Sequence, residues 1–132
     1  MERRPSRRAV LAVVMLLGGC FGESEPEEHA DFVILFPAQS AELDSAAVGI
    51  LDRAVRAAKA APRSRVVVAG YSDRSVSPQA NQILSRLRAQ SVADALVQHG
   101  VERSRVHLEP RYAIGGDPGV ESRRVEVRVG SP

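Results

Sequence analysis

The polar residues between Gly70 and Arg88 could together bind a small zwitterion. Asp73 lies in a short polar turn, and Asn81, Ser85 and Arg88 follow on a predicted helix at spacing i, i+4, i+7, which places them on one helical face. A carboxylate can accept hydrogen bonds from an ammonium group, whereas a guanidinium can bind a carboxylate with two parallel hydrogen bonds. This combination suits an amino-acid-like ligand better than a phosphate or a metal ion.

Two consecutive arginines near the C-terminus provide further cations for the same site. Val125, Val127 and Val129 alternate with polar residues, as in a strand with one buried face. Arg123 shares the parity of these valines and is expected at the edge of the buried face, whereas Arg124 points to the opposite side. We therefore expect one binding site formed by Asp73, Asn81, Arg88 and Arg123, with secondary candidates at Tyr71, Ser72, Ser85 and Arg124.

Each primary candidate also has an ordinary structural explanation when it is considered alone. Aspartate is common in turns between a strand and a helix, which accounts for Asp73. Arg88 could pair with a surface carboxylate, an arrangement that contributes little stability. Asn81 could bond to the backbone in the first turn of its helix. Only the combination of these residues points to a binding site.

Catalysis and metal binding have little support in the sequence. His99 lies at a predicted helix C-terminus, where a cation is favoured, His29 lies in a polar N-terminal segment, and His107 lies on a short strand. No residues have a metal-ligand spacing such as His-Glu-x-x-His, and the glycine-rich segment 115–119 lacks the Gly-Lys-Ser/Thr ending of a phosphate loop. Ser72 and Asp73 have no evident partner base. The sequence indicates a binding protein without a cofactor rather than an enzyme.

The elements that position these residues alternate between strands and helices. Hydrophobic patterning predicts strands at 32–36, 65–71, 106–109 and 124–129. One helix is predicted between the N-cap Asp44 and Pro62, and a second between Ser77 and Gly100. This order predicts an α/β (α+β) fold, a two-layer βαβαββ sandwich with two long helices on one face of a small mixed sheet.

The N-terminus has the features of an export signal that ends at a lipidation site. Four arginines precede an apolar run at 9–19, which suits a signal peptide and is too short to span a bilayer as a helix. The run ends in Leu-Leu-Gly-Gly before Cys20, which resembles the lipobox of bacterial lipoproteins. We expect residues 1–19 to be removed and Cys20 to carry acyl chains such as palmitate.

The expected destination is the outer membrane, with the domain facing the periplasm, because Phe21 rather than an aspartate follows the cysteine. An ordinary export signal with an incidental cysteine is the alternative. The arginine cluster is compatible with either the general secretory or the twin-arginine route.

Removal of the leader changes the charge of the chain. The whole sequence has 18 basic and 16 acidic residues, and residues 1–19 contain four arginines and one glutamate. The chain from residue 20 therefore has 14 basic and 15 acidic residues, so its composition gives no support for nucleic-acid binding. Residues 20–31 form the predicted lipidated start and acidic flexible tether, and residues 32–132 form the predicted domain.

Several motifs resemble the OmpA-like peptidoglycan-associating domain family. They are Gly70-x-x-Asp73, Asn81-x-x-Leu84-Ser85-x-x-Arg88-Ala89, Gly100-Val101-x-x-Ser104-Arg105-Val106 and Arg123-Arg124-Val125-Glu126. The resemblance extends from about Phe32 to Val129. It implies a βαβαββ fold and binding of the diaminopimelate-containing peptide of peptidoglycan. It also implies that Asp73 and Arg88 hold the amino and carboxylate groups of the ligand, while Asn81 and Arg123 line the pocket.

The lipobox together with this domain resembles the layout of Pal-like, peptidoglycan-associated lipoproteins. That layout implies attachment to the outer membrane through the lipid, binding to peptidoglycan, and contact with Tol-like envelope proteins. An alternative on the same fold is a lipid-anchored module for protein–protein interaction that does not bind the wall.

Overall fold

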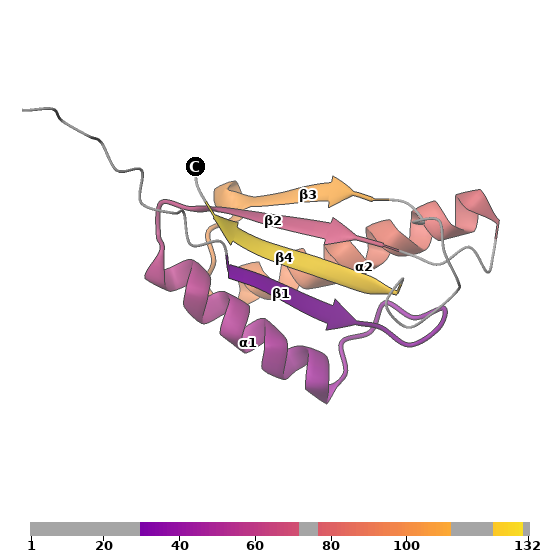
Figure 1. The fold of residues 1–132 in the computed structure, drawn as a ribbon, viewed down its shortest axis with the longest axis horizontal. Coiled ribbons are helices and arrows are strands. Elements are labelled where there is room, and N and C mark those ends of the chain that lie inside the picture. Colours follow the sequence, from indigo (N-terminus) through magenta and orange to yellow (C-terminus); the bar gives the residue numbers. More distant parts are fainter. Residues whose placement is uncertain (1–29, 72–76, 112–122, 131–132) are drawn as a thin grey trace, which may run out of the picture.

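A computed structural model describes residues 30–71, 77–111 and 123–130, which form one sheet and two long helices (Figure 1). The sheet has the strand order β1-β4-β2-β3, with β4 antiparallel to both of its neighbours and β2 parallel to β3. In chain order the elements are β1 (Ala30–Leu35), α1 (Ser45–Ala60), β2 (Arg65–Gly70), α2 (Pro78–Gln98), the short 3-10 helix η1 (Arg103–Arg105), β3 (Val106–Pro110) and β4 (Arg124–Gly130).

The predicted two-layer βαβαββ architecture is confirmed. Both helices cover the same face of the mixed sheet (Figure 1). The strand predicted from Phe32 begins two residues earlier, because Ala30 and Asp31 already pair with Val129 and Arg128 of β4.

The core lies between this face and the helices. Alternate residues of β4, namely Val125, Val127 and Val129, are buried, as their spacing predicts. The helices contribute mainly small and branched side chains, so that sheet and helices pack closely. The fully buried members with the largest side chains are Ile34, Leu51, Leu96, Val66, Val68, Val92, Val125 and Val127.

The helix boundaries follow local capping chemistry. Asp44 caps α1 by accepting a hydrogen bond from the Ala47 N–H at 2.8 Å, and Ser77 caps α2 by accepting one from the Ala80 N–H at 3.2 Å. Gly100 follows α2 with φ +101°, a conformation that favours glycine. All three boundary residues were predicted from the sequence.

The sheet has two ends with different roles in the chain. At the site end, β1 and β2 finish and β4 begins, since Leu35 pairs with Arg124 and Gly70 with Val125. At the entry end, β1 begins and β4 finishes, and Arg65 pairs with Gly130. Both helices run from the site end to the entry end (Figure 1).

At the entry end, Arg105 binds the backbone where α1 ends. Arg105 donates three hydrogen bonds to backbone carbonyls at and beyond the C-terminus of α1: to Ser64 at 2.9 Å, Ala58 at 2.8 Å and Ala61 at 2.7 Å. A helix C-terminus leaves carbonyls without partners within the helix, so this guanidinium acts as a side-chain cap. None of the described helices is both long and apolar enough to cross a bilayer.

Candidate ligand-binding site

The site end is built from backbone that connects three strands. The Phe36 N–H donates to the Arg123 carbonyl, and the Tyr71 N–H donates to the Arg124 carbonyl, each at 2.8 Å. These bonds hold the residues that follow β1 and β2 against the start of β4. The polar residues that were predicted to form the site lie on this framework or on the first half of α2.

Arg88 is fully buried beneath the segment that joins β1 to α1. Its Nε donates to the Ser40 carbonyl at 2.7 Å, its Nη2 to the Pro37 carbonyl at 3.0 Å and its Nη1 to the Tyr71 carbonyl at 3.4 Å. Its guanidinium also lies 5.5 Å from the centre of the Phe36 ring. Backbone dipoles therefore stabilise a cation that would otherwise be costly to bury.

Arg123, directly before β4, approaches the same segment. Its side chain is half-buried, and its Nε donates to the Phe36 carbonyl at 3.4 Å. Arg88 and Arg123 thus bind the consecutive carbonyls of Phe36 and Pro37 from two elements. The structure brings together the two cations that the sequence placed in one site.

Asn81 and Ser85 lie on the same buried face of α2 as Arg88. Asn81 is 5% exposed and Ser85 is fully buried, with its Oγ donating to the Gln82 carbonyl at 3.1 Å. A Cβ on Gly70 would lie 2.1 Å from the Ser85 carbonyl oxygen, so the end of β2 packs directly on this turn of the helix. Only glycine fits at position 70.

The carboxylate half of the predicted site lies outside the described residues. This applies to Asp73 and Ser72, and also to the predicted lipidation site at Cys20. Their assigned roles remain predictions. Tyr71, the last described residue before Asp73, connects directly to the Arg88 network through its carbonyl.

Tyr71 and Arg124 place their side chains on the sheet face away from the helices. The Arg124 guanidinium lies 4.1 Å from the centre of the Tyr71 ring, and its Nε donates to Glu126 at 2.8 Å. The Tyr71 hydroxyl donates to the same carboxylate at 3.3 Å. The structure therefore separates these side chains from the buried one of Arg88, as the parity of Arg124 predicted.

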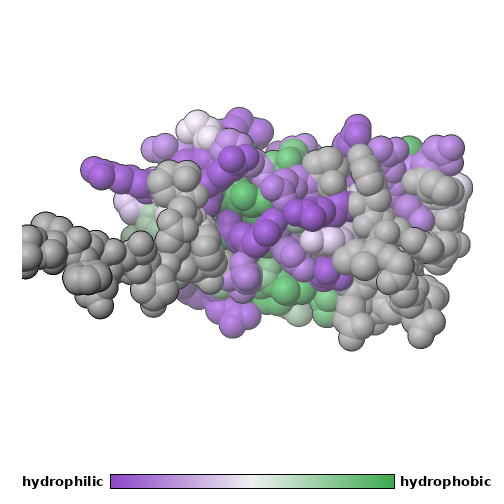
Figure 2. Space-filling view, turned by 45° about the horizontal axis from the view of Figure 1, so that its top comes forward, coloured by the Kyte–Doolittle hydropathy of each residue, from purple (hydrophilic) through white to green (hydrophobic). Residues whose placement is uncertain are grey.

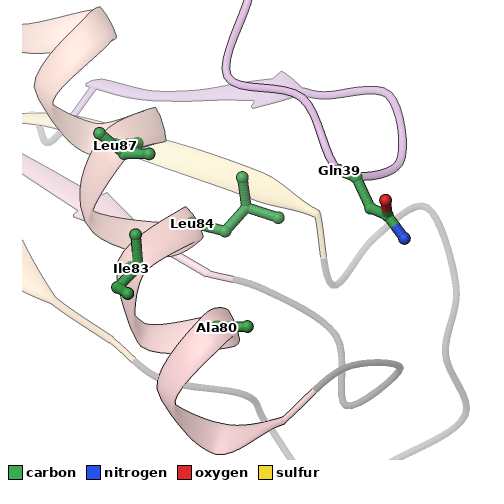
Figure 3. A pocket seen from close by; sticks show the side chains of 5 residues that line it. All are labelled: Gln39, Ala80, Ile83, Leu84 and Leu87. Carbon is green, nitrogen blue, oxygen red and sulfur yellow. The ribbon is translucent and has the colours of Figure 1, made fainter.

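An apolar groove beside the buried arginine was not predicted. It has a volume of about 340 Å³ and is lined by Gln39, Ala80, Ile83, Leu84 and Leu87. In Figure 3, Leu84 points from α2 toward the turn that carries Gln39. Gln39 has φ +52°, and it lies between Pro37 and Ser40, whose carbonyls Arg88 binds. The signal in the sequence was the pair Ile83 and Leu87, which lie four residues apart beside the polar face.

Metal binding finds no support in the part of the chain that the structure describes. Within residues 30–71, 77–111 and 123–130, no three His, Cys, Asp or Glu side chains are grouped so that they could hold a metal ion. The described residues of the site end present guanidinium groups and backbone carbonyls, which interact through hydrogen bonds and charge.

Comparison with known proteins shows the family. The model of the OmpA family matches residues 35–124. The probable lipoprotein YiaD of Escherichia coli (strain K12) is 35% identical over 103 residues, which are 73% of this chain and 47% of that protein. The chain thus spans about half the length of this curated relative.

Solved structures share the fold. The OmpA-like domain of FopA1 from Francisella tularensis is 26% identical with a TM-score of 0.71, over 79% of this chain and 73% of that one. The cell wall anchor of the T6SS from Pseudomonas aeruginosa is 26% identical with a TM-score of 0.64, over 79% of this chain and 82% of that one. The peptidoglycan-associated lipoprotein from Burkholderia pseudomallei has a TM-score of 0.64 over 75% of this chain and 88% of that one, and its 17% identity shows the fold alone.

Proposed function

Because the chain belongs to the OmpA family, we propose that it binds peptidoglycan non-covalently and tethers the outer membrane to the cell wall. The ligand is the diaminopimelate residue of the peptide stem, whose free end carries an ammonium and a carboxylate. The observation that carries this proposal is the convergence of Arg88 and Arg123 on the segment that follows β1. Arg88 also binds the carbonyl of Tyr71, from which the chain continues to Asp73.

The proposed roles follow from the chemistry of the side chains. Asp73 accepts hydrogen bonds from the ammonium group, and the two guanidinium groups attract the carboxylate. Asn81 lines the same pocket from the first turn of α2. In the described residues, Arg88 also fixes the walls, because its three carbonyl partners come from both segments that border the site.

The anchor half of the proposal rests on Cys20 and on the direction of β1. The curated relative is a probable lipoprotein, which supports acylation of the cysteine that follows the lipobox. The chain enters the sheet at Ala30, the first residue of β1, at the end opposite the proposed ligand site. A domain held at one end by lipid and at the other by the wall can bridge the two. A similar fold in a cell wall anchor supports this arrangement.

Cosedimentation with purified sacculi tests the proposal. The chain from residue 20 is used with Cys20→Ser, so that acyl chains make no contribution. We expect it to sediment with sacculi and to be displaced by free diaminopimelate. Asp73→Asn is expected to weaken binding about 10- to 100-fold, since one charge-assisted hydrogen bond is lost. Glu42→Gln, an exposed carboxylate near the same end, is the matched control and should bind normally.

Two results would contradict these assignments. Failure of the unsubstituted domain to sediment would refute wall binding, whereas normal binding by Asp73→Asn would refute the site. For the anchor, cells are labelled with palmitate, and unchanged labelling of Cys20→Ser would exclude that cysteine as the acylated residue.

The apolar groove favours a second candidate function, a lipid-anchored module that binds an envelope protein such as a Tol-like partner. Ile83 and Leu87 line it and remain 60% and 51% exposed. Under this alternative, Ile83→Ser with Leu87→Ser would abolish crosslinking to an envelope protein, and the unsubstituted domain would not sediment with sacculi.

A further inference from the structure

Four exposed cations gather at the entry end of the domain. Arg56 and Lys59 lie on the last turns of α1, Arg63 follows the helix, and Arg65 begins β2. We call this group the basic end. Figure 2 shows hydrophilic side chains at the same end of the molecule, on the left of the view.

None of these four cations forms an ion pair within the described part of the chain. Other arginines do: Arg103 pairs with Asp94 at 3.5 Å, and Arg128 pairs with Glu109 at 3.0 Å. Exposed carboxylates on neighbouring segments, at Asp31, Asp52 and Glu102, likewise form no ion pair with the basic end among the described residues. The positive charge at this end is therefore available to an external anion.

The basic end lies where the chain enters the sheet. Ala30, at the start of β1, and Arg65, at the start of β2, are separated only by β4. Two strand spacings correspond to about 10 Å. Ten residues separate Cys20 from Ala30, so the proposed lipid anchor lies at most about 36 Å away along an extended chain.

We propose that the basic end rests on anionic headgroups of the bilayer in which the chain is anchored. This inference relies on the anchor in the proposed function, and it adds a second contact with the same membrane. An extended anionic surface can attract several of these side chains at once, because all four are exposed at one end of the domain. Each basic residue held near such a surface strengthens binding about fivefold, and the effect decays within about 8 Å at physiological salt.

The tether is the competing partner for these charges, because it carries Glu23, Glu25, Glu27 and Glu28. Its far end is fixed in the bilayer when Cys20 is acylated. The membrane surface, in contrast, is brought close to the basic end by the same attachment. We therefore assign the contact to the lipid.

Vesicle cosedimentation of the unacylated chain, residues 20–132 with Cys20→Ser, tests the assignment. Vesicles of phosphatidylethanolamine with about one third phosphatidylglycerol are compared with neutral vesicles of phosphatidylcholine. We expect binding to the anionic vesicles only, with loss of binding as salt rises. A variant with Arg56→Gln, Lys59→Gln and Arg63→Gln should bind at least tenfold more weakly.

The matched control removes three cations toward the site end and so changes the net charge equally: Arg86→Gln, Arg111→Gln and Arg124→Gln. It should bind vesicles nearly as well as the unsubstituted chain, and thermal melting checks that both variants fold. Equal loss in both variants overturns the proposal, as does absence of vesicle binding by the intact chain, which is the result expected if the tether occupies the cations. Loss of sacculus binding rather than vesicle binding in the basic-end variant assigns these charges to the wall and also overturns it.

The vesicle result is independent of the proposed wall site. Asp73→Asn leaves all four cations in place and should bind vesicles normally, while it loses sacculus binding. A failure of the membrane contact and a failure of wall binding can therefore be distinguished with the same set of proteins.

Discussion

Arg88 at the site end and Arg105 at the entry end perform the same task in different settings. Each guanidinium donates hydrogen bonds to three backbone carbonyls. The partners of Arg105 lie within seven residues of one another at the end of α1, whereas those of Arg88 come from both the β1–α1 segment and the end of β2. Arg105 is half-buried and Arg88 is fully buried. Arg105 caps the end of one helix, whereas Arg88 holds two separate chain segments together at the site end.

The largest expected effect follows from removal of the buried arginine. Arg88→Met leaves three carbonyls without their donor around a side chain that is fully buried. We expect a loss of about 3–5 kcal/mol in the free energy of unfolding, together with loss of sacculus binding. Urea denaturation followed by circular dichroism measures the change. A loss below about 1 kcal/mol would show that the β1–α1 segment holds its position without Arg88.

A smaller effect is expected at the entry end. Arg105→Met removes an equal number of hydrogen bonds, but water can reach carbonyls at a half-exposed helix terminus. We expect a loss of about 1–2 kcal/mol in the same denaturation experiment, with sacculus binding by the folded fraction unchanged. Destabilisation equal to that of Arg88→Met would remove the distinction between the two arginines.

The smallest effect is expected at the residues with positive φ. Gly100 occupies such a position at the entry end, whereas Gln39, with φ +52°, occupies one at the site end. Gln39→Gly relieves the local strain, so we expect a gain of about 0.5–1 kcal/mol in the free energy of unfolding. Gln39 also lines the apolar groove. If its side chain contacts a molecule bound there, Gln39→Gly should bind that molecule more weakly, as titration calorimetry can measure. Unchanged stability would indicate that the turn is not strained.

Local patterns in the sequence predicted most of the fold. The alternation in β4, the caps Asp44 and Ser77, and the stop at Gly100 each depend on residues close in the chain, and the structure confirms them. Arg123 could be placed beside Arg88 from its parity with the buried valines. Such features are determined by the period of a strand or helix and by its capping residues.

The contacts of the two arginines could not be predicted in the same way. The carbonyl partners of Arg88 at Ser40 and Pro37 lie 48 and 51 residues away, and every backbone offers carbonyls, so no side-chain pattern marks these partners. Arg105 belongs to a three-residue 3-10 helix without hydrophobic periodicity. The groove depends on how close the turn at Gln39 comes to α2. Long-range packing decides all three.

The direction of β1 has a mechanical consequence for a protein that bridges two surfaces. If the proposed anchor before Ala30 and the proposed ligand at the site end both hold the domain, tension between them pulls β1 along its length. Its hydrogen bonds to β4 lie across that direction, so they are loaded in shear and share the force along the six-residue ladder. A strand pulled from its edge would instead break these bonds one after another. Under the proposed function, this topology suits the domain to resist stretching of the envelope.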